Sequence, residues 1–290
     1  MKNWREVMEK YPIRLGGPIL QEFSNPEEWI KIHKELGYSA AYFPLSENYT
    51  DEKINQYVQA AINADIIIAE VGVWNNPLSP IDSEREKAFR ESVKKLELAE
   101  KCGAKCCVNV SGSRSKEHWY GPHPDNLTEE TFNMIVEISQ KIIDEVKPEK
   151  TFYTLEPMPW LYPDSIESYQ KLIYAIDRKQ FGVHFDPVNL ISSPQLYYNN
   201  TQFIKDFFET FGNQIKSIHA KDTLLSGELT THLSEVIPGS GHLDFLTLLE
   251  YSASFKDIPV LLEHWETQEE YSLSADYIRS LGNKNGIVFK

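Results

Sequence analysis

Eight short apolar segments alternate with segments of helical periodicity along nearly the whole chain. Such alternation is typical of βα units, in which parallel strands form an inner sheet and helices cover it. Eight strands with helical crossovers favour an α/β fold of the closed (β/α)8 TIM barrel type over an open doubly wound sheet, the structural alternative. The expected strands are residues 13–17, 40–45, 66–71, 106–110, 152–156, 181–186, 215–221 and 260–263.

Helix signals separate these strands. Asn25-Pro26-Glu27-Glu28 is typical of a helix start, because asparagine caps free N–H groups and proline fits the first turn. Gly103 is placed to end a helix whose apolar stripe includes Phe89 and Leu96. The expected helices are residues 26–36, 53–64, 83–102, 128–146, 165–178, 201–210, 245–251 and 269–281.

The length of the chain is compatible with one barrel. Its 290 residues exceed the ~250 typical of this fold but lie within the usual range, although two domains would also fit. No low-complexity tract, charge block or Gly/Ser-rich linker marks a boundary. We therefore expect a single barrel domain over residues 1–290.

The formal net charge of −14 disfavours some classes of binding partner. An acidic surface repels phosphate backbones and anionic lipids, so a small-molecule partner is favoured over nucleic acid or a membrane. A homo-oligomer remains open. Residues 1–6 carry no apolar leader, and no run of ~18 apolar residues is present. Cys102, Cys106 and Cys107 fit buried thiols in a reducing compartment, which predicts a cytoplasmic protein.

Polar side chains end each of the last four expected strands. The segments are Thr154-Leu155-Glu156, Phe185-Asp186, Ile218-His219 and Leu262-Glu263. In each case an apolar run stops at a carboxylate or an imidazole. Because the active sites of such barrels lie at the carboxyl ends of the strands, these four side chains should converge on one point.

Three converging carboxylates repel one another unless a cation neutralises them. Glu156, Asp186 and Glu263 with His219 would supply three oxygen ligands and one imidazole, which suits a six-coordinate divalent ion. Manganese or magnesium fits best, and cobalt or zinc is compatible. The alternative is that each acid caps a strand or pairs with a lysine, which is reasonable for one residue but not for four in succession.

Two further side chains share the inner faces of these strands. His184 lies two residues before the strand-six aspartate, and Lys221 lies two residues after His219. Lys221 is a candidate to polarise a substrate oxygen, or else it pairs with a carboxylate. His184 is a candidate for substrate binding, or else it fills the barrel below the site.

Two tryptophans are candidates for contacts with a sugar. Trp74 follows the third expected strand and Trp160 follows the fifth, so both belong to loops at the same mouth. A flat aromatic face can pack against the apolar face of a sugar ring. A role in packing or at the surface is the alternative for both.

These motifs in this order resemble the sugar isomerase/epimerase superfamily of xylose-isomerase-like TIM barrels, over essentially the whole chain. The resemblance rests on Leu155-Glu156-Pro157, Phe185-Asp186-Pro187-Val188-Asn189, His219-Ala220-Lys221-Asp222, Glu263 and the turn in Pro238-Gly239-Ser240-Gly241-His242-Leu243-Asp244.

The resemblance implies that Glu156, Asp186, His219 and Glu263 are the metal ligands. It further implies that Glu156 and Glu263 are acid–base groups on opposite faces of a bound ketose. The chemistry of the residues agrees, since a chelated carbonyl and hydroxyl lower the cost of an enediolate and a carboxylate can move the proton. The function predicted is a metal-dependent isomerase or epimerase of carbohydrate metabolism acting on a small ketose or aldose.

One position departs from the family pattern. Epimerases of this type commonly have a histidine three residues after the strand-six aspartate, where this chain has Asn189. Asparagine can hydrogen-bond a substrate hydroxyl but cannot carry a proton.

Three other functions are alternatives to an isomerase or epimerase. An endonuclease IV-type nuclease needs a three-zinc cluster and a DNA groove, which the 8 histidines, Asn189 and the acidic charge disfavour. A dehydratase of inosose type would use the same metal and expel water, and it is the main alternative. A non-catalytic sugar-binding barrel is disfavoured by the complete ligand set.

The loops at the mouth of the barrel indicate whether a free or a phosphorylated sugar is the substrate. Gly112-Ser113-Arg114-Ser115-Lys116 after strand four is one candidate phosphate site, because backbone N–H groups and an Arg/Lys pair suit phosphate. If the segment is instead a simple polar loop, a free sugar is favoured as the substrate.

Overall fold

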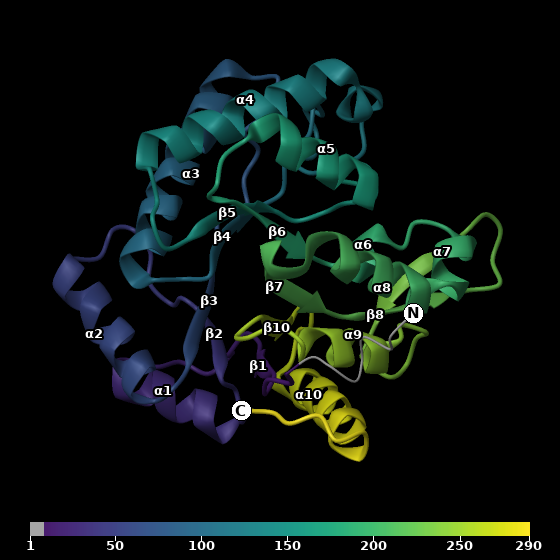
Figure 1. The fold of residues 1–290 in the computed structure, drawn as a ribbon. Coiled ribbons are helices and arrows are strands. Elements are labelled where there is room, and N and C mark those ends of the chain that lie inside the picture. Colours follow the sequence, from purple (N-terminus) through teal and green to yellow (C-terminus); the bar gives the residue numbers. More distant parts are fainter. Residues whose placement is uncertain (1–8) are drawn as a thin grey trace.

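The computed structural model describes residues 9–290, and it contains a closed barrel of eight parallel strands (Figure 1). Residues 1–8, to which the expectation about a leader applies, lie outside the described residues. The strands pair around the barrel in the order β1-β10-β7-β6-β5-β4-β3-β2. They are β1 (Arg14–Gly16), β2 (Ala40–Tyr42), β3 (Ile67–Gly72), β4 (Cys106–Asn109), β5 (Phe152–Leu155), β6 (Phe181–Phe185), β7 (Ile215–Ala220) and β10 (Pro259–Leu262). The expected TIM barrel and all eight expected strands are confirmed.

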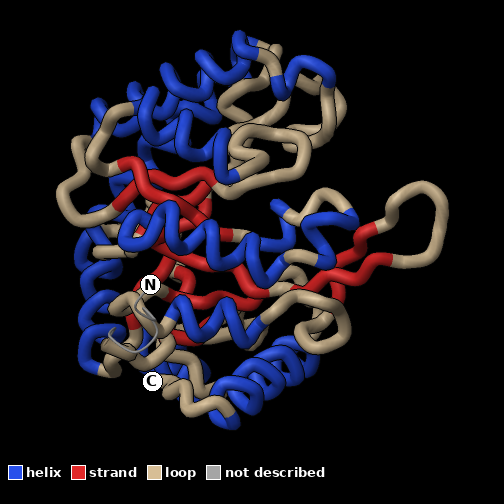
Figure 2. Tube along the Cα trace, turned by 45° about the vertical axis from the view of Figure 1, so that its right-hand side comes forward, coloured by secondary structure: helices blue, strands red, loops and turns tan. Residues whose placement is uncertain are grey.

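Helices cover the outside of the barrel, with the strands enclosed in the middle (Figure 2). The larger ones are α1 (Pro26–Glu35), α2 (Asp51–Asn63), α3 (Asp82–Cys102), α4 (Glu129–Val146), α5 (Ile166–Ile176), α8 (Asn200–Phe211), α9 (Phe245–Ser252) and α10 (Gln268–Lys284). Their starts follow from local chemistry. The Asn25 side chain accepts the Glu28 N–H at 2.8 Å, and Ser165 and Thr267 form capping boxes.

The connection between β7 and β10 holds a feature that the sequence analysis did not predict. β8 (Asp222–Leu225) and β9 (Leu233–Val236) form an antiparallel hairpin that projects from the barrel (Figure 2). β9 is partly exposed on both faces, so its sequence lacks the apolar alternation by which strands are recognised. The short helices α6 (Pro187–Leu190) and α7 (Pro194–Tyr198) after β6, and the 3-10 helices η2 (Pro124–Leu127) and η3 (Gly212–Gln214), were likewise not expected.

The core lies between the strands and the helices. The rings of Phe185 in β6 and Phe207 in α8 stack at 3.8 Å, which fixes α8 against the sheet. Cys102, Cys106 and Cys107 are buried free thiols, as the sequence predicted. Burial raises the pKa of Cys102 to about 12, so its thiol is unreactive.

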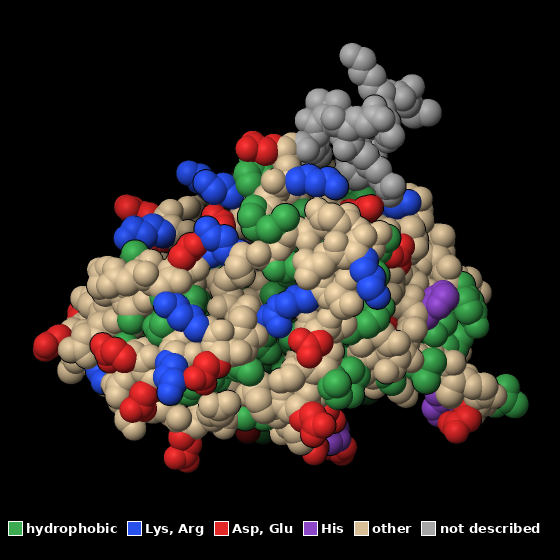
Figure 3. Space-filling view, turned by 90° about the horizontal axis from the view of Figure 1, so that it is seen from below, with side chains coloured by type: hydrophobic (Ala, Val, Ile, Leu, Met, Phe, Trp, Pro, Cys, Tyr) green, Lys and Arg blue, Asp and Glu red, His purple; other side chains and the backbone are tan. Residues whose placement is uncertain are grey.

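The surface is mixed in charge. On the face shown in Figure 3, Lys and Arg side chains are interspersed with Asp and Glu. No helix among the described residues is long and apolar enough to span a bilayer.

Candidate active site and metal centre

A cavity of about 1300 Å³ opens at the carboxyl end of the barrel, where the loops that follow the strands meet. This is the end at which (β/α)8 enzymes place their active sites. Its wall combines carboxylates and histidines with many aromatic rings. The residues that line it include Tyr42, Trp74, Trp119, Tyr120, Glu156, Trp160, Asn189, His219, Glu235, Glu263 and His264.

The four residues that end the last strands converge on one point. Glu156, Asp186, His219 and Glu263 are all buried, and one ligand atom from each lies within 4.8 Å of the others. The Nδ1 atom of His219 lies 3.0 Å from Glu156 Oε1 and 2.7 Å from Glu263 Oε2. Glu156, Asp186 and Glu263 directly follow β5, β6 and β10, and His219 lies near the end of β7, so neighbouring parallel strands carry all four to the same mouth.

The donor set of this cluster fits a divalent cation. Burial raises the pKa of Asp186 to about 8, and the charges of Glu263 and Glu156 add to this although Lys221 opposes it. Burial also raises the pKa of Glu263, but the charges of His219 and Lys221 outweigh it and hold that pKa well below its ordinary range, so positive charge at this point keeps the carboxylate ionised. Three oxygen donors and one imidazole suit a hard or borderline divalent ion.

Lys221 is enclosed by carboxylates. Its Nζ atom lies 2.7 Å from Asp186 Oδ2, 2.6 Å from Glu263 Oε1 and 3.1 Å from Glu235 Oε1. Burial lowers the pKa of Lys221, but the negative charges of Asp186 and Glu263 outweigh it and hold the pKa well above its ordinary value. The side chain is fully buried and does not line the cavity, and its ammonium group is paired with these carboxylates.

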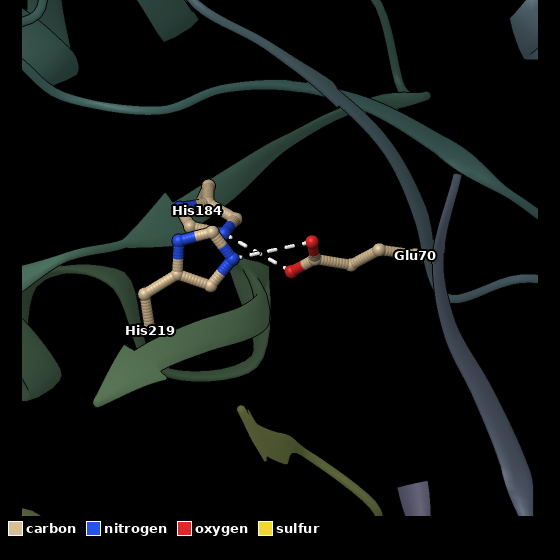
Figure 4. A group of neighbouring side chains, drawn as sticks. All are labelled: Glu70, His184 and His219. Atoms are coloured by element: carbon tan, nitrogen blue, oxygen red, sulfur yellow. Dashed lines mark hydrogen bonds and ion pairs between the residues drawn. The ribbon is translucent and has the colours of Figure 1, made fainter. Parts of the chain in front are cut away.

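Glu70 in β3 is a buried partner of the site that the sequence analysis missed. Its Oε2 atom lies 3.2 Å from His219 Nε2, and its Oε1 atom lies 3.1 Å from His184 Nε2 (Figure 4). Burial raises the pKa of Glu70, but His219 and His184 outweigh it and hold the pKa below its ordinary range. A carboxylate inside the apolar run of residues 66–71 was the signal that could have identified it.

His184 lies below the site rather than in it. Its side chain is fully buried and does not line the cavity, and it contacts Glu70. The His184 and His219 rings meet edge to face, with their centres 4.2 Å apart. The geometry thus favours the filling role over direct contact with a substrate.

Asn189 reaches the cavity beside Glu156. Its Nδ2 atom lies 3.4 Å from Glu156 Oε1, and its backbone N–H donates to Asp186 Oδ1 at 3.1 Å. The Val188 N–H donates to the same oxygen at 3.0 Å. One oxygen of Asp186 is therefore held by the start of α6, which leaves the other toward Lys221.

Both candidate tryptophans line the cavity. Trp74 has a left-handed backbone (φ 56°), and its ring centre lies 6.4 Å from that of His219. A Cβ atom at Gly72 would collide with the Trp74 ring, so glycine at that position leaves space for it. Trp160 donates its Nε1–H to the Tyr120 carbonyl at 2.8 Å.

The β8–β9 hairpin brings further charged groups to the rim. The Oε2 atom of Glu235 in β9 lies 2.8 Å from the Nδ1 atom of His264, which is half-exposed. Asp222, at the start of β8, accepts the backbone N–H groups of Gly239, Gly241 and Leu243 at 2.9 Å each. The aspartate of the His219-Ala220-Lys221-Asp222 motif thus holds the glycine-rich turn that the sequence analysis singled out.

The candidate phosphate loop lies away from the cavity. None of residues 112–116 lines it. The Arg114 side chain contacts Met134 and lies 3.8 Å from a Glu130 carboxylate oxygen. The loop therefore fits the alternative of a simple polar connection.

Comparison with known families decides the classification. The model of the xylose isomerase-like TIM barrel matches residues 30–281. The chain belongs to this family. The eight-stranded barrel and the ligand cluster at its mouth agree with membership of the xylose isomerase-like barrels.

Solved structures of the same fold align along nearly the whole chain. An E. coli 3-keto-D-glucoside 4-epimerase matches with a TM-score of 0.64 at 15% identity, covering 93% of this chain and 99% of its own. The probable 3-DHS dehydratase of petrobactin synthesis from Bacillus anthracis has a TM-score of 0.68 at 14% identity, covering 96% and 100%. A Mycobacterium smegmatis xylose isomerase-like barrel in complex with magnesium has a TM-score of 0.64 at 12% identity, covering 96% of each. No curated protein sequence matches this chain significantly.

Proposed function

We propose that this xylose isomerase-like barrel is a metal-dependent sugar isomerase or epimerase that moves a proton at the carbon next to a carbonyl. The observation that carries the proposal is the cluster of three carboxylates and one imidazole at the cavity, with ligand atoms within 4.8 Å of one another. Three of the four, Glu156, His219 and Glu263, line the cavity and so can reach a substrate. The epimerase among the structural neighbours supports this class of chemistry.

Glu156, Asp186, His219 and Glu263 would hold one divalent ion, with manganese or magnesium preferred and cobalt or zinc compatible. Such an ion would stabilise the negative charge that develops on the substrate oxygens. A neighbour of the same fold was solved in complex with magnesium, which supports a divalent metal.

Glu156 and Glu263 are the proposed acid–base pair. Both carboxylates line the cavity, and each lies within 3.0 Å of His219 Nδ1. One removes the proton from the α-carbon and the other returns one. Return to the opposite face of the same carbon gives an epimer, whereas return to the neighbouring carbon gives an aldose–ketose isomer.

The remaining residues divide into substrate contacts and positioning residues. Asn189, Trp74 and Trp160 line the cavity and are proposed to hold the sugar through a hydrogen bond and two aromatic faces. Lys221 and His184 do not line it. We therefore assign them to positioning, with Lys221 holding Asp186 and Glu263 and His184 holding Glu70.

A dehydratase is the second candidate, because the same proton removal can be followed by loss of water. The dehydratase neighbour and the unprotonatable Asn189 beside Glu156 favour it. In either case the acidic lining, which includes Glu156, Glu235 and Glu263, disfavours a nucleic-acid substrate.

The two candidates separate in one experiment. The protein is loaded with manganese without oxygen and incubated with free and phosphorylated ketoses in deuterated water, and the products are followed by NMR. An isomerase or epimerase introduces deuterium next to the carbonyl and changes configuration or carbonyl position. A dehydratase yields an unsaturated or deoxy product instead, and the absence of any exchange across the panel contradicts both.

A further inference from the structure

The cavity is large for one sugar ring. Its volume of about 1300 Å³ exceeds the roughly 300–1,000 Å³ of pockets that enclose a drug-sized molecule. A pyranose beside Glu156 and Glu263 would occupy only a small part of it. The remaining volume is filled either by a second part of a larger ligand or by water.

Aromatic rings gather in two places along the cavity. Trp74 and Tyr42 lie at the metal centre, each with its ring centre 6.4 Å from that of His219. Trp119 and Tyr120, after β4, form a second pair, which we call the outer aromatic platform. Trp119 and Tyr120 remain 40% and 44% exposed, so their rings are available to a ligand.

The outer aromatic platform is held in place. The Trp119 and Tyr120 rings meet edge to face at 4.6 Å, and the Tyr120 carbonyl accepts the Trp160 Nε1–H at 2.8 Å. The buried Asn126 side chain closes the loop behind them, because its Nδ2 donates to the Gly121 carbonyl at 3.0 Å. Large apolar rings fixed in the open around a cavity are typical of a binding surface.

The charge of the lining restricts the ligand. Among the described residues, no lysine or arginine lines the cavity, whereas Glu156, Glu235 and Glu263 do. A phosphorylated or carboxylated group outside the metal centre would meet this negative charge with no lysine or arginine to pair with it. The ligand that fits is therefore uncharged.

We propose that the substrate is an uncharged glycoside whose reacting sugar carries a ketone, with that sugar at Glu156 and Glu263 and a second ring stacked on the outer aromatic platform. This inference rests on the proposed function for the placement of the reacting sugar. The second ring is recognised by a flat apolar face, which both an aryl group and another pyranose present. A two-ring ligand would place one ring at the metal end and the other on the platform, both of which line the same cavity.

Binding measured apart from turnover tests the proposal. Calorimetric titration of the manganese-loaded protein would compare methyl glucoside and galactoside with their phenyl counterparts and with cellobiose and lactose. We expect the two-ring ligands to bind about tenfold more tightly than the methyl glycosides. Tighter binding of the phenyl set identifies an aryl group as the second ring, and tighter binding of the disaccharides identifies a sugar.

Variants locate the second ring. Trp119→Ala, or Tyr120→Ala if that protein does not fold, should remove the two-ring advantage and leave methyl glycoside binding unchanged. Tyr174→Ala, which removes an aromatic ring 88% exposed on α5, is the matched control and should change nothing. Equal affinity for one-ring and two-ring ligands, including no binding by either, overturns the proposal, as does a two-ring advantage that survives Trp119→Ala. If deuterium enters a monosaccharide but two-ring ligands bind no more tightly, the proposed isomerase chemistry stands and the two-ring inference fails. If two-ring ligands bind more tightly but no deuterium is exchanged, the binding inference stands and the proposed chemistry fails.

Discussion

His219 lies between Glu70 and Glu263, with Nε2 3.2 Å from the first carboxylate and Nδ1 2.7 Å from the second. Glu70 comes from β3, across the barrel from the strands that supply the proposed ligands. If Nε2 carries its proton toward Glu70, the Nδ1 lone pair faces the proposed metal. A carboxylate behind a histidine ligand in this way sets the ring orientation and raises its basicity.

Glu70→Gln should weaken manganese binding by about 10- to 100-fold, because an amide is a poorer acceptor for the His219 N–H. Calorimetric titration measures the change, and thermal unfolding verifies that the metal-free variant remains folded. Glu269→Gln, on the exposed start of α10, is the control and should bind manganese normally. Unchanged affinity in Glu70→Gln would show that Glu70 does not act through His219.

Each chain should bind about one divalent ion, and His219→Ala or Glu156→Gln should remove most of it, because each loses one of four ligands. Elemental analysis of dialysed protein gives the stoichiometry. Saturating metal should also raise the unfolding free energy of the natural protein, by about 2.7 kcal/mol at 100 times the dissociation constant. Full occupancy in both variants would rule out this site.

Glu263→Gln should cost far more in rate than in metal affinity. The glutamine keeps one oxygen for the ion but has no useful basicity, and acid–base catalysis contributes about 10²–10⁴-fold. Turnover and manganese titration on the same preparation separate the two effects. Near-full turnover with bound metal would reduce Glu263 to a ligand only.

Metal binding should release protons at neutral pH and strengthen as pH rises. Burial lowers the pKa of His219, but Glu263, Tyr42 and Glu70 outweigh it and hold the pKa well above its ordinary value. The His219 ring is therefore protonated at pH 7 in the metal-free protein and must lose a proton to bind an ion. Titrations at pH 7 in buffers of different ionisation enthalpy count the protons. Heat independent of the buffer, or affinity that falls between pH 6 and pH 8.5, contradicts this account.

Lys221→Met should destabilise the metal-free protein by about 3–5 kcal/mol, because Asp186 and Glu263 lose a buried positive charge. Manganese should recover part of this loss by supplying positive charge at the same carboxylates. Urea unfolding with and without metal measures both values. An equal loss in the two conditions would indicate that Lys221 acts only through packing.

The barrel and the four-residue cluster were predictable from the sequence because both depend on local patterns. Apolar runs of strand length, separated by helical periodicity, identify βα units, and a polar residue that ends a parallel strand lies at the active-site mouth of a barrel. Glu156, Asp186, His219 and Glu263 follow from that rule alone. The β8–β9 hairpin was not predicted, because β9 is partly exposed on both faces and has no apolar alternation.

Only the tertiary structure decided which side chains meet across the barrel. The pairing of Glu70 with His184 and His219, and the enclosure of Lys221 by Asp186, Glu235 and Glu263, depend on barrel closure, which joins residues up to 149 positions apart. The same closure sets the width of the cavity, and the loops then bring Trp119 and Tyr120 to its wall while residues 112–116 stay outside. The physical reason is that strand periodicity specifies the face on which a side chain lies, whereas its partner on that face is set by strand register and loop packing.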